Sequence, residues 1–181
     1  MTQIKGLIFD LDNTLALSQQ FHVQAFSEVF KKHGLTYTGK DDLRFAGKGS
    51  HCTFPEFFAE HGIKLTPVQV KQYSDEKTAV YNRIIHEMDI KPVKGAPAFL
   101  SKMEKMEYRM VVASGNKPEA IEYILRKIGI REFFEAIVTN KDVIKSKPAP
   151  DIFLKSAEKL GLKPEECIVF EDAVNGIRAA Q

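Results

Sequence analysis

Short apolar runs separated by longer amphipathic segments form the pattern of this chain. Each run is too short for a helix and is followed directly by polar residues, which is typical of buried parallel strands. The four runs span Ile4–Phe9, Met110–Ala113, Ala136–Thr139 and Cys167–Phe170. Helical periodicity fills Pro118–Ile128 and Asp151–Leu160, and a glycine follows each segment in the C-terminal capping position. Strand and helix in alternation predict an α/β fold with a parallel sheet.

The stretch between the first two runs follows a different pattern. Residues 17–91 are far more than the ~10 to 12 that a minimal crossover requires. Phe21, Ala25 and Val29 recur at every fourth position, as on the buried face of a helix. We therefore predict two domains, with two connectors acting as a hinge between them. They are a Rossmann-like α/β core formed by residues 1–16 and 92–181, and an all-α helical cap formed by residues 17–91.

The composition is that of a folded protein. With 44% hydrophobic and 28% charged residues among 181, disorder is excluded as the dominant state. A formal net charge of +2 is too small for a general attraction to nucleic acid or to a membrane surface, so neither partner is expected. No apolar stretch approaches the ~18 residues that cross a bilayer. Cys52 and Cys167 lie far apart in sequence, which argues against a disulfide framework and predicts a cytoplasmic protein.

Candidate chemistry follows the predicted strand ends. Asp10 and Asp12 come directly after the first run, two positions apart, so in an extended segment both carboxylates face one pocket and require a cation. A strand-end Asx turn explains the same residues. Ser114, Gly115 and Asn116 follow the second run and offer a hydroxyl and exposed amides for a phosphate. The alternative there is a turn in which Asn116 caps the next helix.

Two further strand ends carry charged residues. Lys147 precedes a proline that restricts its backbone, although a lone lysine is more often solvent-facing. Glu171 and Asp172 form a second acidic pair after the last run, or else the acidic first turn of a helix. Open parallel sheets bind ligands at the carboxyl ends of their strands. The four ends together therefore predict a phosphate and metal site at that edge.

In order and spacing, these residues resemble the motifs of the haloacid dehalogenase-like superfamily of phosphoryl-transfer enzymes, in the branch with a helical cap inserted after the first motif. The resemblance covers essentially the whole chain, with motifs that look like Asp10-Leu11-Asp12-Asn13-Thr14, Ser114, Lys147 and Glu171-Asp172. It implies that Asp10 attacks phosphorus to form an aspartyl phosphate and that Asp12 acts as acid and base.

The resemblance also implies a ligand set. Mg²⁺ is expected on the Asp10 carboxylate, the Asp12 backbone carbonyl and Asp172, with Glu171 acting through a water. The other phosphoryl oxygens are expected to meet Lys147, Ser114 and the amides near Gly115 and Asn116.

Some features separate branches within the superfamily. Asp12 argues against dehalogenation, because a halide leaving group needs no proton. The pattern fits sugar-phosphate phosphatases and β-phosphoglucomutase-like members, which share a residue similar to His22. Lys48 and His51 lie in a segment that resembles the specificity loop of the cap, and Lys77 resembles a cap lysine that contacts substrate phosphate, with snorkelling to solvent as its alternative. Mutase-type members carry an arginine where this chain has His51, which favours a phosphatase.

We therefore predict a Mg²⁺-dependent phosphatase of a small phosphorylated metabolite, monomeric or weakly homo-oligomeric. A hexose-phosphate mutase is the alternative in the same fold. A phospho-acceptor signalling domain needs neither Asp12 nor the long insert, and a catalytically silent binding module would not need every motif residue. Because similar proteins continue through another strand and helix, we also expect a core truncated at its C-terminus, with the fourth strand at an exposed edge.

Overall fold

The structure, a computed structural model, describes residues 3–181 and divides into two compact units. One is an α/β unit formed by the residues up to Ser18 together with Ile90–Gln181, and the other is a helical unit formed by Gln19–Asp89. The helical unit thus begins and ends two residues inside the segment expected from the sequence. No helix among the described residues has the length and apolar character needed to span a membrane.

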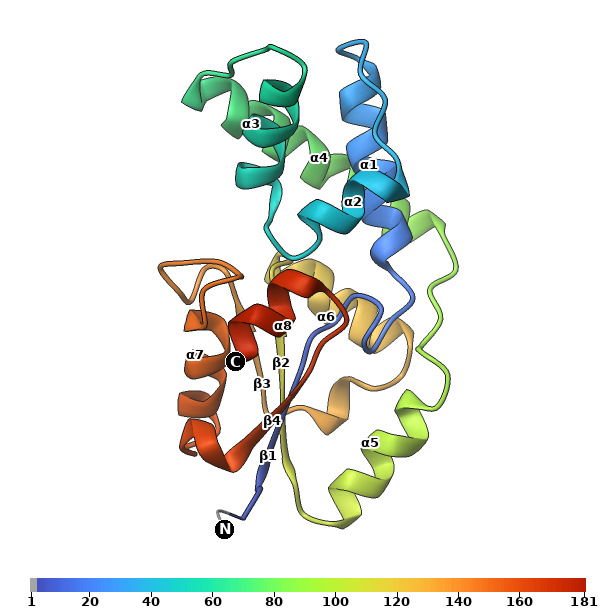
Figure 1. Cartoon of the computed structure of the whole chain (residues 1–181). Helices are drawn as coiled ribbons and strands as arrows, with labels where there is room; N and C mark the ends of the chain where they lie inside the picture. The colour runs from blue at the N-terminus through green and yellow to red at the C-terminus, as the bar shows by residue number, and fades with distance from the viewer. Residues whose placement is uncertain (1–2) are drawn as a thin grey trace. The chain divides into compact units, whose positions relative to one another are not determined.

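A four-stranded parallel sheet forms the centre of the α/β unit, as predicted (Figure 1). Its strands are β1 (Gly6–Phe9), β2 (Arg109–Ser114), β3 (Ala136–Thr139) and β4 (Cys167–Phe170). Their order is β3-β2-β1-β4, so β1 is central and β4 lies at an edge of the described sheet. Both the parallel α/β class and the edge position of the fourth strand are confirmed.

The helices of this unit are only partly those expected. The predicted segments form α6 (Pro118–Lys127) and α7 (Asp151–Lys159), and Gly129 and Gly161 follow them with positive φ angles of 69° and 63°. Two other helices were not predicted, namely α5 (Ala96–Lys105) and α8 (Val174–Ala180). Leu100 is the only residue of α5 that is buried, so the apolar stripe of this helix is too narrow to recognise in the sequence. Single turns of 3-10 helix span Arg131–Phe133 and Pro164–Glu166.

The two faces of the sheet pack against different helices. On one face, Ile8, Val111 and Val138 pack with Ile152 and Phe153 of α7 in one hydrophobic cluster. Figure 1 shows α7 on one side of the sheet and α5 and α6 on the other. Successive side chains of a strand point to opposite faces, so the fully buried β1 needs an apolar residue at every position. This packing fixes the strand ends that carry the polar residues.

The helical unit has an aromatic core of its own. Its helices are α1 (Gln19–Lys31), α2 (Gly39–Phe45), α3 (Ser50–Glu60) and α4 (Pro67–Glu87). α1 and α3 both pack on α4, and phenylalanines from α1, α2 and α3 fill the space between them. Thr66 and Gln69 form a reciprocal capping box at the start of α4. The all-α character predicted for this segment is therefore present.

Candidate active site

Residues from three strands and one loop meet at the carboxyl edge of the sheet. Asp10 directly follows β1, Glu171 directly follows β4, and Ser114 is the last residue of β2. Lys147 comes from the loop between β3 and α7. β2, β1 and β4 are neighbours and run in the same direction, so their ends are brought together by the strand order alone.

A buried ion-pair cluster occupies the centre of this edge. The ammonium of Lys147 donates to Oδ1 of Asp10 at 2.6 Å and to Oε2 of Glu171 at 2.5 Å. Asp10 is only 7% exposed and Lys147 4% exposed. Ligand oxygens of Asp10, Glu171 and Asp172 all lie within 4.8 Å of one another. Two carboxylates, Asp10 and Glu171, therefore share one ammonium, and the exposed carboxylate of Asp172 lies beside them.

The pKa values reflect this imbalance. The pKa of Asp10 is raised from 3.8 to about 7: burial is the largest cause, Lys147 opposes the rise, and Glu171 and Asp12 add to it. Burial also raises the pKa of Asp172, with Glu171 acting in the same direction. Burial lowers the pKa of Lys147, but Asp10 and Glu171 outweigh it and hold the pKa above its ordinary value. The cluster thus carries more negative charge than one ammonium balances.

This donor set fits a hard divalent cation. Carboxylate oxygens are the ligands that Mg²⁺ prefers, and three of them converge where positive charge is lacking. The carboxylate of Asp12 is engaged elsewhere: Ser18 Oγ donates to its Oδ1 at 2.6 Å, and Asn116 Nδ2 donates to its Oδ2 at 2.9 Å. That arrangement is compatible with the expectation that only the backbone carbonyl of Asp12 serves as a ligand.

The segment after β2 forms a tight polar turn. The backbone N–H of Asn116 donates to the Oγ of buried Ser114 at 3.2 Å. A Cβ on Gly115 would lie 3.2 Å from the side-chain amide nitrogen of Asn140, so glycine keeps this turn close to its neighbour. The residue that caps α6 is Lys117, and the alternative in which Asn116 caps the helix is wrong. The side chain of Asn116 is instead directed to Asp12.

Several residues that support the site were missed from the sequence. Gly176 lies in α8, and a Cβ there would stand 2.0 Å from Cδ of Glu171, so only glycine leaves room for that carboxylate. The N–H of Ala173 donates to Oε1 of Glu171 at 3.1 Å. Asn13 has a φ of 55°, and its side chain hydrogen-bonds to Asp172. The positive φ fits asparagine, which tolerates the left-handed region better than most residues.

Comparison with known proteins shows which protein family this chain resembles. The family model for haloacid dehalogenase-like hydrolases matches residues 7–181. The chain belongs to the haloacid dehalogenase-like hydrolases. It is 30% identical to a fructose-1-phosphate phosphatase of Escherichia coli, over 97% of this chain and 90% of that protein. It is 28% identical to a β-phosphoglucomutase of Bacillus subtilis, over 97% and 78% respectively. A crystal structure of β-phosphoglucomutase from Clostridium difficile superposes with a TM-score of 0.89 at 26% identity, covering 98% of this chain and 80% of that one.

The helical unit of this haloacid dehalogenase-like hydrolase buries two of the residues considered for the substrate site, His22 and Lys77. Nζ of Lys77 donates to Nδ1 of His22 at 2.6 Å, and both side chains are buried. The ring of Tyr81 stacks on His22, and the Lys77 ammonium lies 4.8 Å from the centre of the same ring. The alternative in which Lys77 snorkels to solvent is wrong, because the aromatic rings and the histidine hold its ammonium inside the unit.

Lys48 lies just before α3, and His51 lies in the first turn of that helix. Lys48 donates to Oε2 of Glu56 at 2.6 Å, and His51 is exposed. Gly47 and Gly49 flank Lys48 with φ angles of 83° each, a conformation that favours glycine. The two glycines thus let the chain turn around Lys48, whereas a role of Lys48 or His51 in substrate contact stays a prediction.

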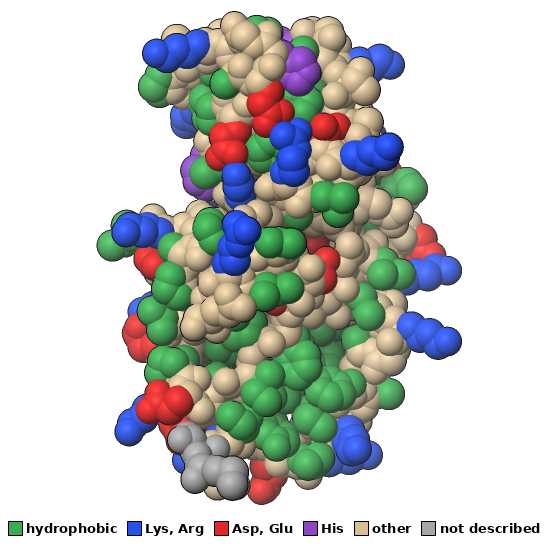
Figure 2. All heavy atoms as spheres, viewed as in Figure 1, with side chains coloured by type: hydrophobic (Ala, Val, Ile, Leu, Met, Phe, Trp, Pro, Cys, Tyr) green, Lys and Arg blue, Asp and Glu red, His purple; other side chains and the backbone are tan. Residues whose placement is uncertain are grey.

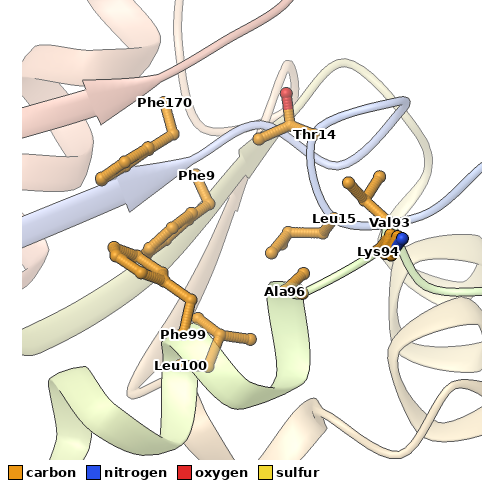
Figure 3. A pocket seen from close by; sticks show the side chains of 10 residues that line it. Phe9, Thr14, Leu15, Val93, Lys94, Ala96, Phe99, Leu100 and Phe170 are labelled. Atoms are coloured by element: carbon orange, nitrogen blue, oxygen red, sulfur yellow. The ribbon is translucent and has the colours of Figure 1, made fainter.

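An apolar groove of about 340 Å³ lies on the sheet face beside α5. Phe9 and Phe170 stack at a centroid distance of 4.6 Å, and Phe99 meets both rings edge-on (Figure 3). Figure 2 shows hydrophobic side chains gathered on this face of the α/β unit. Thr14 and Lys94 carry the only polar side chains in the lining, so the groove has no carboxylate that could hold a metal ion or form an aspartyl phosphate. The carboxylate cluster, not this groove, is the candidate active site.

Proposed function

We propose that the chain is a Mg²⁺-dependent phosphatase of a small phosphorylated sugar that works through an aspartyl phosphate on Asp10. One observation carries the proposal: Asp10, Glu171 and Asp172 converge within 4.8 Å, with the ammonium of Lys147 between the first two. Sequence similarity to a fructose-1-phosphate phosphatase supports the substrate class.

The first half-reaction transfers the phosphoryl group to the protein. A carboxylate oxygen of Asp10 attacks phosphorus, and the bond from phosphorus to the ester oxygen breaks. Asp12 gives a proton to that departing oxygen, because an alkoxide is a poor leaving group without one. Lys147 and Ser114 are suited to hold the equatorial phosphoryl oxygens, since charge spreads over these oxygens in the transition state.

The second half-reaction returns Asp10 to its starting state. Asp12, now ionised, takes a proton from water as the water oxygen attacks phosphorus. The bond between phosphorus and the Asp10 oxygen breaks, and inorganic phosphate leaves. Asp12 regains the proton that it gave up, so the cycle balances and the net reaction is hydrolysis of a phosphate ester.

Asp10 and Asp172 would hold the metal, together with the backbone carbonyl of Asp12, and Glu171 is close enough to act beside them. When bound, Mg²⁺ supplies positive charge that offsets the carboxylates and the phosphoryl group. The raised pKa of Asp10 makes this contribution important, because a protonated Asp10 is not a nucleophile.

A sugar-phosphate mutase is the second candidate, since the chain is also similar to β-phosphoglucomutases. A mutase must hold a doubly phosphorylated intermediate and exclude water until the second transfer. His51 is exposed, and an imidazole cannot bind a distal phosphate through two parallel N–H bonds as the guanidinium of an arginine does. Hydrolysis is therefore favoured over return transfer.

A cytoplasmic location remains a prediction.

The deciding experiment supplies the chain with β-glucose 1-phosphate and with fructose 1-phosphate in the presence of Mg²⁺. Free phosphate and glucose 6-phosphate are quantified over the same time course. We expect phosphate release from fructose 1-phosphate, and from β-glucose 1-phosphate at least as much free phosphate as glucose 6-phosphate.

Nearly complete conversion to glucose 6-phosphate would replace the phosphatase with the mutase. Absence of phosphate release from either sugar phosphate, and from a wider panel of phosphorylated nucleotides and short acids, would remove the phosphatase proposal. The control is Asp10→Asn, which should release no phosphate from any of them.

A further inference from the structure

The proposed acid and base, Asp12, is held by a residue that no motif contains. Ser18 is completely buried, and its hydroxyl donates to Oδ1 of Asp12 at 2.6 Å. The same hydroxyl lies 3.3 Å from the carbonyl oxygen of Ala16, a longer contact and a weaker one. The short bond to a carboxylate is therefore the main interaction of this hydroxyl.

The backbone fixes Ser18 in place independently of that bond. Its N–H donates to the carbonyl of Ala16 at 2.9 Å. The two connectors of the α/β unit also pair with each other, since Leu17 N–H donates to Lys91 and Val93 N–H donates to Leu15, both at 2.9 Å. The Ser18 hydroxyl thus has a set position before substrate arrives, and the Asp12 side chain adapts to it.

A second donor acts on the other oxygen of the same carboxylate. Asn116 Nδ2 donates to Oδ2 of Asp12 at 2.9 Å, from the turn after β2. These two bonds reach both oxygens from separate parts of the α/β unit, so they fix the position and the plane of the carboxylate. A proton donor that must face first an ester oxygen and then a water gains from this restriction, because misplaced donors transfer protons slowly.

We propose that Ser18 is a positioning residue that orients Asp12 for proton transfer. The proposal rests on the proposed function, in which Asp12 protonates the leaving oxygen. Its consequence is selective: loss of the Ser18 hydroxyl slows reactions whose leaving group needs a proton and spares those whose leaving group does not. A purely structural role of Ser18 would slow both alike.

The test compares two substrates in single-turnover reactions with enzyme in excess, measuring release of the leaving group. The leaving group of fructose 1-phosphate is a sugar alkoxide, which needs a proton. The leaving group of p-nitrophenyl phosphate is a phenolate, which is stable without one. For Ser18→Ala we expect at least a tenfold loss with the sugar phosphate and less than about threefold with the aryl phosphate, since general acid catalysis is worth ~10²–10⁴ in rate. Ser18→Thr should restore the sugar-phosphate rate to within about threefold, because it keeps the hydroxyl.

Ser156→Ala is the matched control. Ser156 is also completely buried, but its hydroxyl donates to the carbonyl of Ile152 in α7 at 2.7 Å and does not contact Asp12. Ser156→Ala should leave the ratio of the sugar-phosphate rate to the aryl-phosphate rate unchanged. Melting temperatures of all variants are measured alongside. If Ser18→Ala does not fold, Ser18→Cys takes its place, because a thiol is close in size and a weaker donor.

Asp12→Asn separates this proposal from the function on which it rests. If Asp12→Asn shows no difference between the two leaving groups, the proposed role of Asp12 itself is overturned. Asp12→Asn can instead show the difference while a folded Ser18 variant, Ser18→Ala or Ser18→Cys, does not, either because it slows both substrates equally or because it slows neither of them. In that case only the role of Ser18 is overturned. A leaving-group effect in both Asp12→Asn and the Ser18 variant, restored by threonine, supports it.

Discussion

Asp10 is the residue at which charge and burial conflict most strongly. It is 7% exposed, it shares Lys147 with Glu171, and its pKa is raised to about 7. Without a bound metal ion, an ionised Asp10 therefore destabilises the fold. Catalysis and stability make opposite demands on this side chain, a common situation in active sites.

Asp10→Asn should abolish phosphate release and raise the stability of the metal-free protein. The pKa of Asp10 in the folded protein exceeds the ordinary value of 3.8. Between about pH 4 and 7, the carboxyl is therefore protonated in the folded chain and ionised in the unfolded chain. Wild-type stability contributed by this group therefore falls as pH rises through that window. At pH 8 the variant should gain at most about 4 kcal/mol, with little gain at pH 4. Urea unfolding with chelator at both pH values measures this, and an equal gain at both would contradict it.

Gly176→Ala should weaken metal binding without unfolding the chain. The added methyl would overlap Glu171, which is tied to Lys147 and to the Ala173 N–H, so the carboxylate must leave the cluster. We expect Mg²⁺ affinity, measured by calorimetry, to fall by roughly tenfold or more, as for other residues that orient ligands. Gly39→Ala is the control, because a Cβ there meets no atom within 4 Å. Unchanged affinity in Gly176→Ala would show that Glu171 has another place to go.

These residue-scale outcomes show what sequence reasoning reached. That Asp10, Lys147 and Glu171 would meet could be predicted, because parallel strands bring their carboxyl ends to one edge whatever the details. Gly176 and Ser18 could not be recognised, since their importance depends on the direction in which the side chains of Glu171 and Asp12 point, which hydrophobic spacing does not reveal. Lys77 was open to two readings because hydrophobic spacing does not reveal whether aromatic rings enclose an ammonium.

At the scale of elements, α2 is held by a buried polar contact rather than by hydrophobic packing alone. Asp42 in its first turn is buried, and it accepts hydrogen bonds from Tyr37 Oη at 2.9 Å and from Gln19 Nε2 at 2.5 Å. Burial raises the pKa of Tyr37, and Asp42 beside it raises it further. Tyr37 therefore keeps its proton, and its hydroxyl donates to Asp42, at neutral and mildly alkaline pH.

Tyr37→Phe should destabilise the helical unit, because it removes a donor from a buried carboxylate while leaving the aromatic packing. The expected loss is about 1–3 kcal/mol in the free energy of unfolding. Urea denaturation followed by circular dichroism measures it. Tyr108→Phe, in the α/β unit, is the control for loss of a hydroxyl. An unchanged midpoint in Tyr37→Phe would mean that Gln19 and the turn around Asp42 suffice.

Element prediction succeeded where hydrophobic spacing was strong and failed where it was weak. α6 and α7 each bury four side chains and were predicted to within one residue. α5 buries one, and α8 has seven residues with a glycine among them, so neither carries a recognisable periodicity. α2 and α3 were predicted only as part of an all-α segment, since their phenylalanines alone do not mark where one helix stops.

At the scale of the whole molecule, metal binding and folding should be linked. Ligands that bind only the folded state stabilise it, by about 2.7 kcal/mol at one hundred times the dissociation constant. Mg²⁺ should therefore raise the melting temperature of the protein, and chelator should remove both the shift and the activity. Asp172→Asn should lose the shift, whereas Asp142→Asn should keep it, because Asp142 bonds to Thr139 outside the cluster. A melting temperature insensitive to Mg²⁺ would contradict the assignment of the cluster as a metal site.

The strand order has a further consequence for how the chain is made. β1 is the central strand, and Gly6 pairs with Arg109 on one side and with Cys167 on the other. On the ribosome, the first strand of the sheet therefore emerges long before either neighbour and must remain unpaired meanwhile. The contiguous residues 19–89 have a core of their own and can fold during that interval, whereas the α/β unit can close only after residue 170 has been synthesised. Delayed translation between residues 90 and 170 should accordingly prolong the exposure of an apolar strand to chaperones and to other nascent chains.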